Sequence, residues 1–299
     1  MKLIFMGTPD FTLPVLEMLA KKHEIVALYT RAPKPSGHGM KLTKSAVHEW
    51  GEAHNIPVYT PNTLKDEQVQ KQIASFGAEA IIVYAYAMMI PTAVLNCTPK
   101  GCINIHPSLL PRWRGAAPMV RTIQAGDIET GVSLMRLDEG WDTGPVFGQE
   151  KVTISPDETP ETLRDKLNPL AEKMLIDLLD NFHEPTPQKE EGACYAPKVE
   201  KTEFLIDWTQ SAIQIERNIR AFGKCYFILN GKRFKVLKAK VIDGTGEIGT
   251  TIDDNLSVAC GKGVLNLEIL QKEGKNPTAK RDFLLGIKVP KGTNLCATN

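Results

Sequence analysis

Long hydrophobic runs are missing from this sequence, and no stretch approaches the roughly 18 consecutive apolar residues of a transmembrane helix. The first residues contain too few apolar side chains before Gly7 and Pro9 for the core of a secretory signal. Cysteine is scarce, with six residues in 299, and Cys97 and Cys102 have no second pair at the spacing of zinc ligands. These absences predict a cytoplasmic protein with reduced thiols, no membrane association and no metal site.

An excess of one charge is also missing, since the formal net charge is +1, which argues against a general polyanion binder. The average conceals a difference along the chain. Residues 201–299 contain 16 Lys and Arg and 10 Asp and Glu, a net charge of +6. Residues 1–200 contain 20 Lys and Arg and 25 Asp and Glu, a net charge of −5. This asymmetry indicates that the two parts of the chain have different tasks.

Short apolar runs alternate with helical patterns over the first 130 residues. Strands are expected at residues 2–7, 24–30, 56–60, 78–87 and 101–106, and helices at 10–23, 42–55, 64–77 and 116–127. This alternation predicts a doubly wound, Rossmann-like α/β domain with a mostly parallel sheet. Residues 131–138 and 145–154 are expected to add antiparallel strands, and residues 159–182 a long closing helix.

The composition changes after residue 184. Residues 185–203 are rich in proline and charge, which is typical of a linker. A helix is expected at 207–222, and the short strands and Gly-rich turns after it predict a small β-barrel. We therefore expect an N-terminal domain over residues 1–184, a linker over 185–203 and a C-terminal domain over 204–299.

The C-terminal domain includes GKRFKVLKAK, with five basic residues in ten. Because side chains alternate along a strand, these five residues are not expected to line one surface. They are Lys232, Arg233, Lys235, Lys238 and Lys240. Solvated surface lysines are the alternative to a polyanion-binding face.

Asn104 and His106 lie two residues apart at the end of an expected strand, so their side chains share one face. Pro107 biases the residue before it toward an extended backbone, which keeps that alignment to the end of the strand. Folds of this class bind ligands at the carboxyl ends of their strands. An amide beside an imidazole can stabilise an oxyanion and move a proton, as attack on a carbonyl requires. The alternative is a buried pair whose polar groups bond to the backbone.

A catalytic histidine needs a group that orients it, most often a carboxylate. The segment MRLDEGWDTG offers Asp138, Glu139 and Asp142, and spacing does not choose among them. Asp142 has a glycine two residues away on either side, which lets the backbone approach a ligand closely. An aspartate in a Gly-rich turn is also a common turn-former.

Several segments of the chain resemble the methionyl-tRNA formyltransferase family. They are NIHPSLLPRWRGAAP, AGDIETGVSLMRLDEGWDTG and FMGTPDF, followed toward the C-terminus by YAPKVEKTEFLIDW, ERNIRAF and DFLLG. The Asn-x-His…Asp set with Ser-Leu-Leu-Pro is shared by all formyl-folate transferases, and the C-terminal segments narrow the resemblance to the tRNA enzymes.

The resemblance implies a formyltransferase catalytic domain over residues 1–184 and a tRNA-binding β-barrel over 204–299. It implies that the catalytic residues are Asn104, His106 and Asp142. It also implies that the folate site is lined by Ser108, Leu109, Leu110 and Pro111. The roles of Arg112 and Arg114, in the same loop, stay open.

The implied reaction transfers the formyl group of 10-formyltetrahydrofolate, a co-substrate, to the α-amine of initiator methionyl-tRNA, for initiation of translation. No metal takes part. Asn104 and a protonated His106 would hold the oxygen of the tetrahedral intermediate, with Asp142 orienting the imidazole. We expect a monomer in the cytoplasm.

Two departures from the family pattern concern the expected tRNA contacts. The loop after the second strand reads PSGHG, with His38 where the family usually has an arginine. The segment after RAF reads GKCYFILNGK and lacks the usual Trp-Pro-Gly.

Two rival functions stay open. A formyltransferase acting on an amino sugar or a purine precursor would share the three catalytic residues but would not need a basic barrel. A non-catalytic RNA-binding or folate-sensing protein on this fold would have no use for those three residues.

Overall fold

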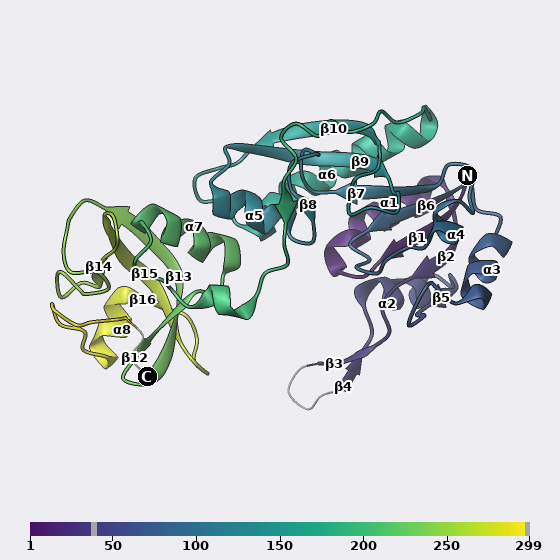
Figure 1. Ribbon diagram of the computed structural model, residues 1–299. Coiled ribbons are helices and arrows are strands. Elements are labelled where there is room, and N and C mark those ends of the chain that lie inside the picture. Colours follow the sequence, from purple (N-terminus) through teal and green to yellow (C-terminus); the bar gives the residue numbers. More distant parts are fainter. Residues whose placement is uncertain (37–40, 297–299) are drawn as a thin grey trace. The chain divides into compact units, whose positions relative to one another are not determined.

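The computed structural model describes residues 1–36 and 41–296, which form two compact units (Figure 1). Unit 1 consists of Met1–Pro118, Glu129–Thr153 and Arg164–Ala196, and unit 2 of Met119–Ile128, Ile154–Leu163 and Pro197–Asn299. His38, the first departure from the family pattern, lies outside the described residues. Among the described helices, none is long and apolar enough to cross a membrane. The domain boundaries at residues 184 and 204 stay a prediction.

Unit 1 is built on a seven-stranded sheet with the order β10-β9-β7-β6-β1-β2-β5 (Figure 1). The strands are β1 (Lys2–Gly7), β2 (Glu24–Tyr29), β5 (Val58–Tyr59), β6 (Ala80–Tyr84), β7 (Cys102–His106), β9 (Glu129–Arg136) and β10 (Val146–Thr153). The five from β5 to β7 run parallel, and β9 and β10 are antiparallel. Strands β1 and β6 are almost wholly buried, as their continuous apolar sequences require. The predicted doubly wound sheet with added antiparallel strands is confirmed.

Two of the helices of unit 1 begin at residues whose side chains cap them. The helices of this unit are α1 (Leu13–Lys22), α2 (Ala46–Ala53), α3 (Glu67–Ser75), α4 (Thr92–Leu95) and most of α6 (Pro160–Asp180), with a 3-10 turn at Asp10–Thr12. Ser45 caps α2 by accepting the N–H of His48, and Asp66 caps α3 by accepting that of Gln68. Two small sheets were not expected, because their strands are only two or three residues long. They are β3 (Lys34–Ser36) with β4 (Lys41–Thr43), and β8 (Arg114–Gly115) with β11 (Tyr195–Ala196).

Unit 2 is organised around a separate antiparallel sheet with the strand order β12-β13-β15-β14, in which β16 also pairs with β15. The strands are β12 (Tyr226–Leu229), β13 (Lys232–Ile242), β14 (Ser257–Ala259), β15 (Val264–Lys272) and β16 (Thr278–Ala279). The helices are α5 (Pro118–Ala125), α7 (Ala212–Phe222) and α8 (Lys280–Gly286), α5 belonging to this unit apart from its first residue. Ser211 caps α7, and Gly223 ends it in the left-handed conformation that glycine adopts easily. The predicted small C-terminal β-barrel is found as a separate antiparallel sheet, preceded by the predicted helix.

Candidate active site

Strand β7 places Asn104 and His106 on one face at its carboxyl end, because the two residues lie two positions apart. Its neighbours are β6, which is parallel, and β9, in which Ser133 lies opposite His106. His106 is only 3% exposed, whereas Asn104 is partly exposed. The strand thus buries an imidazole and keeps an amide beside it within reach of a ligand.

A buried serine of β9 holds the turn that follows β7. Ser133 Oγ donates to the carbonyl of Ser108 (2.6 Å) and accepts from the N–H of Leu110 (3.1 Å) and from Gln149 Nε2 (2.8 Å). All three hydrogen-bonding positions of this hydroxyl are therefore used. Gln149 Nε2 also donates to the carbonyl of Leu110 at 2.8 Å, and Ser108 Oγ to that of Arg112 at 2.7 Å. These bonds satisfy buried polar groups and fix the path of the backbone that follows.

That backbone supplies groups to both His106 and Asp142. The carbonyl oxygen of Trp113, a residue with φ of 64°, lies 2.9 Å from His106 Nε2. Because a carbonyl only accepts, the Nε2 atom carries the proton. On the other side of the ring, Asp142 Oδ2 lies 3.6 Å from Nδ1 and accepts the N–H of Gly115 at 2.8 Å.

The three carboxylates that spacing left open have different partners. Asp138 accepts from the hydroxyl of Thr143 at 2.9 Å, and Glu139 from that of Thr92 at 2.6 Å. Both acids are exposed. Among these three acids, Asp142 is the one that the structure brings to the buried histidine.

Burial lowers the pKa of His106 below its ordinary value of 6.5, because a charged imidazolium loses hydration in the interior. The negative charge of Asp142 and the bond to the Trp113 carbonyl raise the pKa, but burial is the larger effect. The imidazole is therefore neutral at pH 7. With the proton on Nε2, the lone pair of Nδ1 is free to accept another.

The predicted folate stretch divides into buried and partly exposed side chains. Ser108 and Leu110 are 0% and 5% exposed, and the hydroxyl of Ser108 is bonded within its own turn. Leu109 and Pro111 are partly exposed. The Asn104 side chain forms no hydrogen bond within residues 1–36 and 41–296, so its amide is available to a ligand.

Backbone groups and one remote side chain complete the site, and no sequence pattern pointed to them. The backbone groups are the carbonyl of Trp113 and the N–H of Gly115. The side chain is that of Gln188, whose Nε2 donates to the carbonyls of Asp142 (2.8 Å) and Gly144 (2.7 Å). Gly115 gave the one available signal, since a Cβ there would come within 2.5 Å of a neighbouring aromatic ring.

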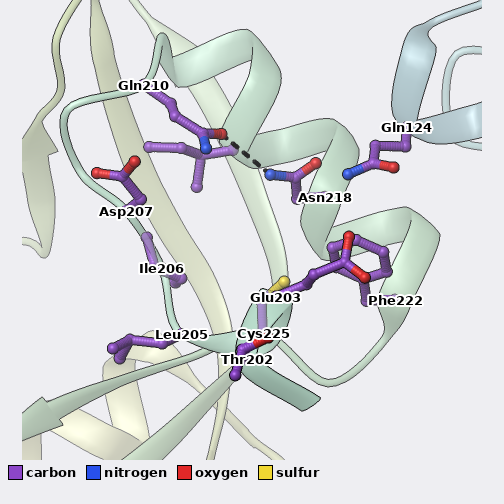
Figure 2. A pocket seen from close by; sticks show the side chains of 11 residues that line it. Gln124, Thr202, Glu203, Leu205, Ile206, Asp207, Gln210, Asn218, Phe222 and Cys225 are labelled. Carbon is purple, nitrogen blue, oxygen red and sulfur yellow. Dashed lines mark hydrogen bonds between the residues drawn. The ribbon is translucent and has the colours of Figure 1, made fainter. Parts of the chain in front are cut away.

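A cavity of about 190 Å³ in unit 2 is lined by both apolar and polar side chains, and two of the polar ones bond to each other. Figure 2 shows the bond from Asn218 Nδ2 to Gln210 Oε1, at 3.1 Å, and Asn218 also accepts from Gln214. Neither His106 nor Asp142 lines this cavity. Across the described ranges, no group of three or more His, Cys, Asp and Glu side chains is arranged to hold a metal.

Comparison with family models matches both parts of the chain. Residues 1–179 match the formyl transferase model, and residues 198–288 match the model of the formyl transferase C-terminal domain.

Curated relatives match nearly the whole chain. The methionyl-tRNA formyltransferase of Paramagnetospirillum magneticum is 42% identical over 99% of this chain and 100% of its own. That of Parvibaculum lavamentivorans is 43% identical over 99% and 100%. Among solved structures, an N-formyltransferase from Helicobacter canadensis, in complex with folinic acid and dTDP-3-aminofucose, has a TM-score of 0.65 at 18% identity. The match covers 91% of this chain and 99% of the Helicobacter protein, and it shows that the two share a fold.

The imidazole of His106 is expected to titrate below pH 6.5, and the Asp142→Asn variant to lower its pKa further, because the substitution removes a negative charge that raises it. NMR titration of ¹⁵N-labelled histidines measures both values. His183 serves as an internal control, since its bonds to the carbonyls of Phe147 and Asn181 raise its pKa above 6.5. A His106 that titrates at or above 6.5, or an unchanged value in the variant, would contradict this electrostatic description.

Proposed function

The chain belongs to the formyl transferase family, and we propose that it transfers the formyl group of 10-formyltetrahydrofolate to the α-amine of initiator methionyl-tRNA, for initiation of translation. Relatives of 42% and 43% identity, matched over their full length, are named methionyl-tRNA formyltransferases. The observation that carries the chemistry is the geometry of His106, a buried imidazole whose Nε2 is bonded to the Trp113 carbonyl and whose Nδ1 faces Asp142.

Transfer begins when the neutral amine of methionine attacks the formyl carbon. The new C–N bond places negative charge on the formyl oxygen and positive charge on the attacking nitrogen. The amide of Asn104 donates to that oxygen, which is most valuable where charge develops in the transition state. His106 Nδ1, which holds no proton at rest, accepts the proton that the amine loses.

Asp142 stabilises the imidazolium that this step creates, with its carboxylate 3.6 Å from Nδ1. The proton then passes to N10 of the folate as the bond between that nitrogen and the formyl carbon breaks. Tetrahydrofolate and formylmethionyl-tRNA leave, and His106 is neutral again. In these steps Asn104 stabilises the formyl oxygen and His106 transfers the proton. The family resemblance instead implied that a protonated His106 would be a second hydrogen-bond donor to that oxygen.

The folate site, in this proposal, includes the turn after β7. Leu109 and Pro111 offer partly exposed apolar surface, of the kind that packs against a flat ring system. Ser108 and Leu110 are buried and bonded through their hydroxyl and backbone groups, so their contribution is to hold the turn in place.

A bulge in β13 gives unit 2 a basic face that simple alternation excluded. Val236 pairs with Leu270 but Lys238 pairs with the next residue of β15, Ile269, so the residue between them is extra. The extra residue reverses the alternation for the rest of the strand. Arg233, Lys235, Lys238 and Lys240 therefore lie on one face, opposite the buried Phe234 and Val236. Four of the five basic residues thus share one face and Lys232, at the hairpin end, does not, which agrees with the expectation that the five would not all line one surface.

This basic face supports the assignment of methionyl-tRNA binding to unit 2. Phosphate backbones bind where lysine and arginine neutralise them and release counterions. Lys240 also lines a cavity of about 430 Å³ together with Arg217 and Arg220 of α7. Lys238 is partly neutralised, with its ammonium 3.7 Å from Glu268, so Lys235 and Lys240 are the better test of the face.

The rival functions explain fewer of these observations. A sugar N-formyltransferase shares the fold at 18% identity, whereas relatives of more than twice that identity are named for methionyl-tRNA. A basic face in unit 2 has no task in sugar formylation, and a neutral imidazole beside a carboxylate has none in a pure binder. We also propose that the protein acts as a monomer in the cytoplasm, where its tRNA substrate is used.

The His106→Ala variant is expected to lower kcat by about 10²–10⁴-fold, because it removes the general base, and Asn104→Ala by about 10²–10³-fold, because it removes an oxyanion donor. Folate affinity should be retained in both. The two losses should combine to less than their product, since both groups act on one transition state. Single-turnover formylation of methionyl-tRNA, with folate binding measured by calorimetry, tests this. A His106→Ala protein with near-normal turnover would refute the mechanism.

The paired variant Lys235→Glu with Lys240→Glu is expected to weaken tRNA binding and to flatten the plot of log K against log salt by roughly 1.4–1.8, given about 0.7–0.9 for each neutralised phosphate. Folate affinity should not change. Lys288→Glu with Lys291→Glu is the matched control, since it changes net charge equally at exposed positions outside β13. Filter binding of initiator tRNA at several salt concentrations makes the comparison. Equal losses in the two pairs would mean that overall charge, rather than this face, binds the tRNA.

A further inference from the structure

Residues 186–196, here called the strap, follow α6 and are tied at each end to a different part of the active site. At the first end, Thr186 and Val146 exchange two backbone hydrogen bonds of 2.8 Å, next to the loop that holds Asp142. At the other end, Tyr195 and Ala196 form β11, which pairs with β8 in the turn after β7. The strap therefore bridges the loop of the carboxylate and the turn whose backbone contacts the histidine.

Gln188 lies between the two ends and contacts both parts. Its Nε2 donates to the carbonyls of Asp142 and Gly144, at 2.8 Å and 2.7 Å. Its Oε1 accepts from Arg114 Nε at 3.0 Å. Arg114 lies between Trp113, whose carbonyl binds His106, and the glycine whose N–H binds the Asp142 carboxylate. One side chain thus joins the two segments that face the imidazole.

The loop of Asp142 has a backbone that needs such support. Asp142 has φ of 55°, a left-handed conformation that costs a side-chain-bearing residue free energy. Gly144 is so tightly packed that a Cβ there would overlap the carbonyl of Arg136. The carbonyls of Asp142 and Gly144 both accept a hydrogen bond from the same amide of Gln188. Without that amide, the observed geometry loses two bonds that favour it over other loop conformations.

We infer that Gln188 is a positioning residue for formyl transfer, which sets the place of the Asp142 carboxylate relative to His106. This inference rests on the proposed function. Gln188 acts through the backbone of the loop and does not touch the reacting atoms. Its loss therefore changes the alignment of the catalytic groups but removes none of them. An error of about 1 Å in such an alignment can cost a factor of about 10² in rate.

The test compares Gln188→Ala and Gln188→Glu with Glu190→Gln in the full-length protein. The Gln188→Glu side chain keeps the size and the acceptor toward Arg114 but has no N–H to donate. Glu190 is a matched control on the strap, because its exposed carboxylate pairs with the same arginine at 3.0 Å and makes no bond to the Asp142 loop in the part of the chain described. Exposed ion pairs of this kind contribute little.

Both Gln188 variants are expected to lower kcat by about 10–100-fold with the KM values for folate and tRNA unchanged. The pH profile provides the readout that a general loss of stability would not move. Asp142 is the charged group that raises the pKa of His106, the other influences being burial and the Trp113 carbonyl. A displaced Asp142 raises it less, so the acidic limb of kcat against pH should move to lower pH in Gln188→Ala, the variant that adds no charge. Glu190→Gln should match the parent in both kcat and pH limb.

Four outcomes are distinguishable. A lower kcat in both Gln188 variants, with the limb shift in Gln188→Ala and an unchanged control, supports the inference. Unchanged kcat in Gln188→Ala overturns it, and so does a fall in kcat with no shift of the acidic limb. Equal losses in Glu190→Gln would show that any disturbance of the strap suffices, which also overturns the role of the amide. Parent-like rates in His106→Ala would instead refute the proposed mechanism itself, whatever Gln188 does.

Discussion

The hydrogen bond from His106 Nε2 to the carbonyl of Trp113 decides the chemical state of the site. A carbonyl cannot donate, so the proton of the neutral ring stays on Nε2 and the lone pair of Nδ1 faces Asp142. If a carboxylate accepted this hydrogen bond instead, its negative charge would raise the pKa of the ring and favour the doubly protonated imidazolium. Burial lowers the pKa of the ring by more than Asp142 and the Trp113 carbonyl raise it, which favours the uncharged imidazole that a base needs at pH 7.

The geometry of both partners of His106 comes from one short segment. Trp113 supplies the carbonyl, and Gly115, two residues later, supplies the N–H that binds the Asp142 carboxylate. Any shift of this turn therefore moves the acceptor of Nε2 and the carboxylate opposite Nδ1 together. The turn is held from the inside by the hydroxyl of Ser133 and from the outside by the strap. The catalytic pair is thus defined by backbone groups as much as by side chains.

The sequence predicted what depends on local periodicity and missed what depends on the backbone. Alternating strands and helices predicted the sheet, and the period of two along β7 predicted that Asn104 and His106 share a face. Spacing did not distinguish Asp138, Glu139 and Asp142, because the distance of each from His106 depends on the path of the loop after β9. The bulge of β13 was missed, since the extra residue is defined by its partner strand, and the letters GKRFKVLKAK do not mark it. Gln188 was missed because no pattern marks a side chain whose partners are carbonyls more than 40 residues away.

The strap also changes how the two tasks of the chain are to be separated. Composition marks residues 185–203 as a linker, since proline and charge are common where few contacts cross between domains. Yet residues 186–196 form backbone bonds with the segments around Asp142 and Trp113, and they belong to unit 1. A protein that ended at residue 184 would lack the amide donors of the Asp142 loop and the partner strand of β8. Loss of activity in such a fragment would then report on the geometry of the catalytic pair as well as on tRNA binding. We therefore propose to divide the two tasks after Ala196, where the last segment of unit 2 begins.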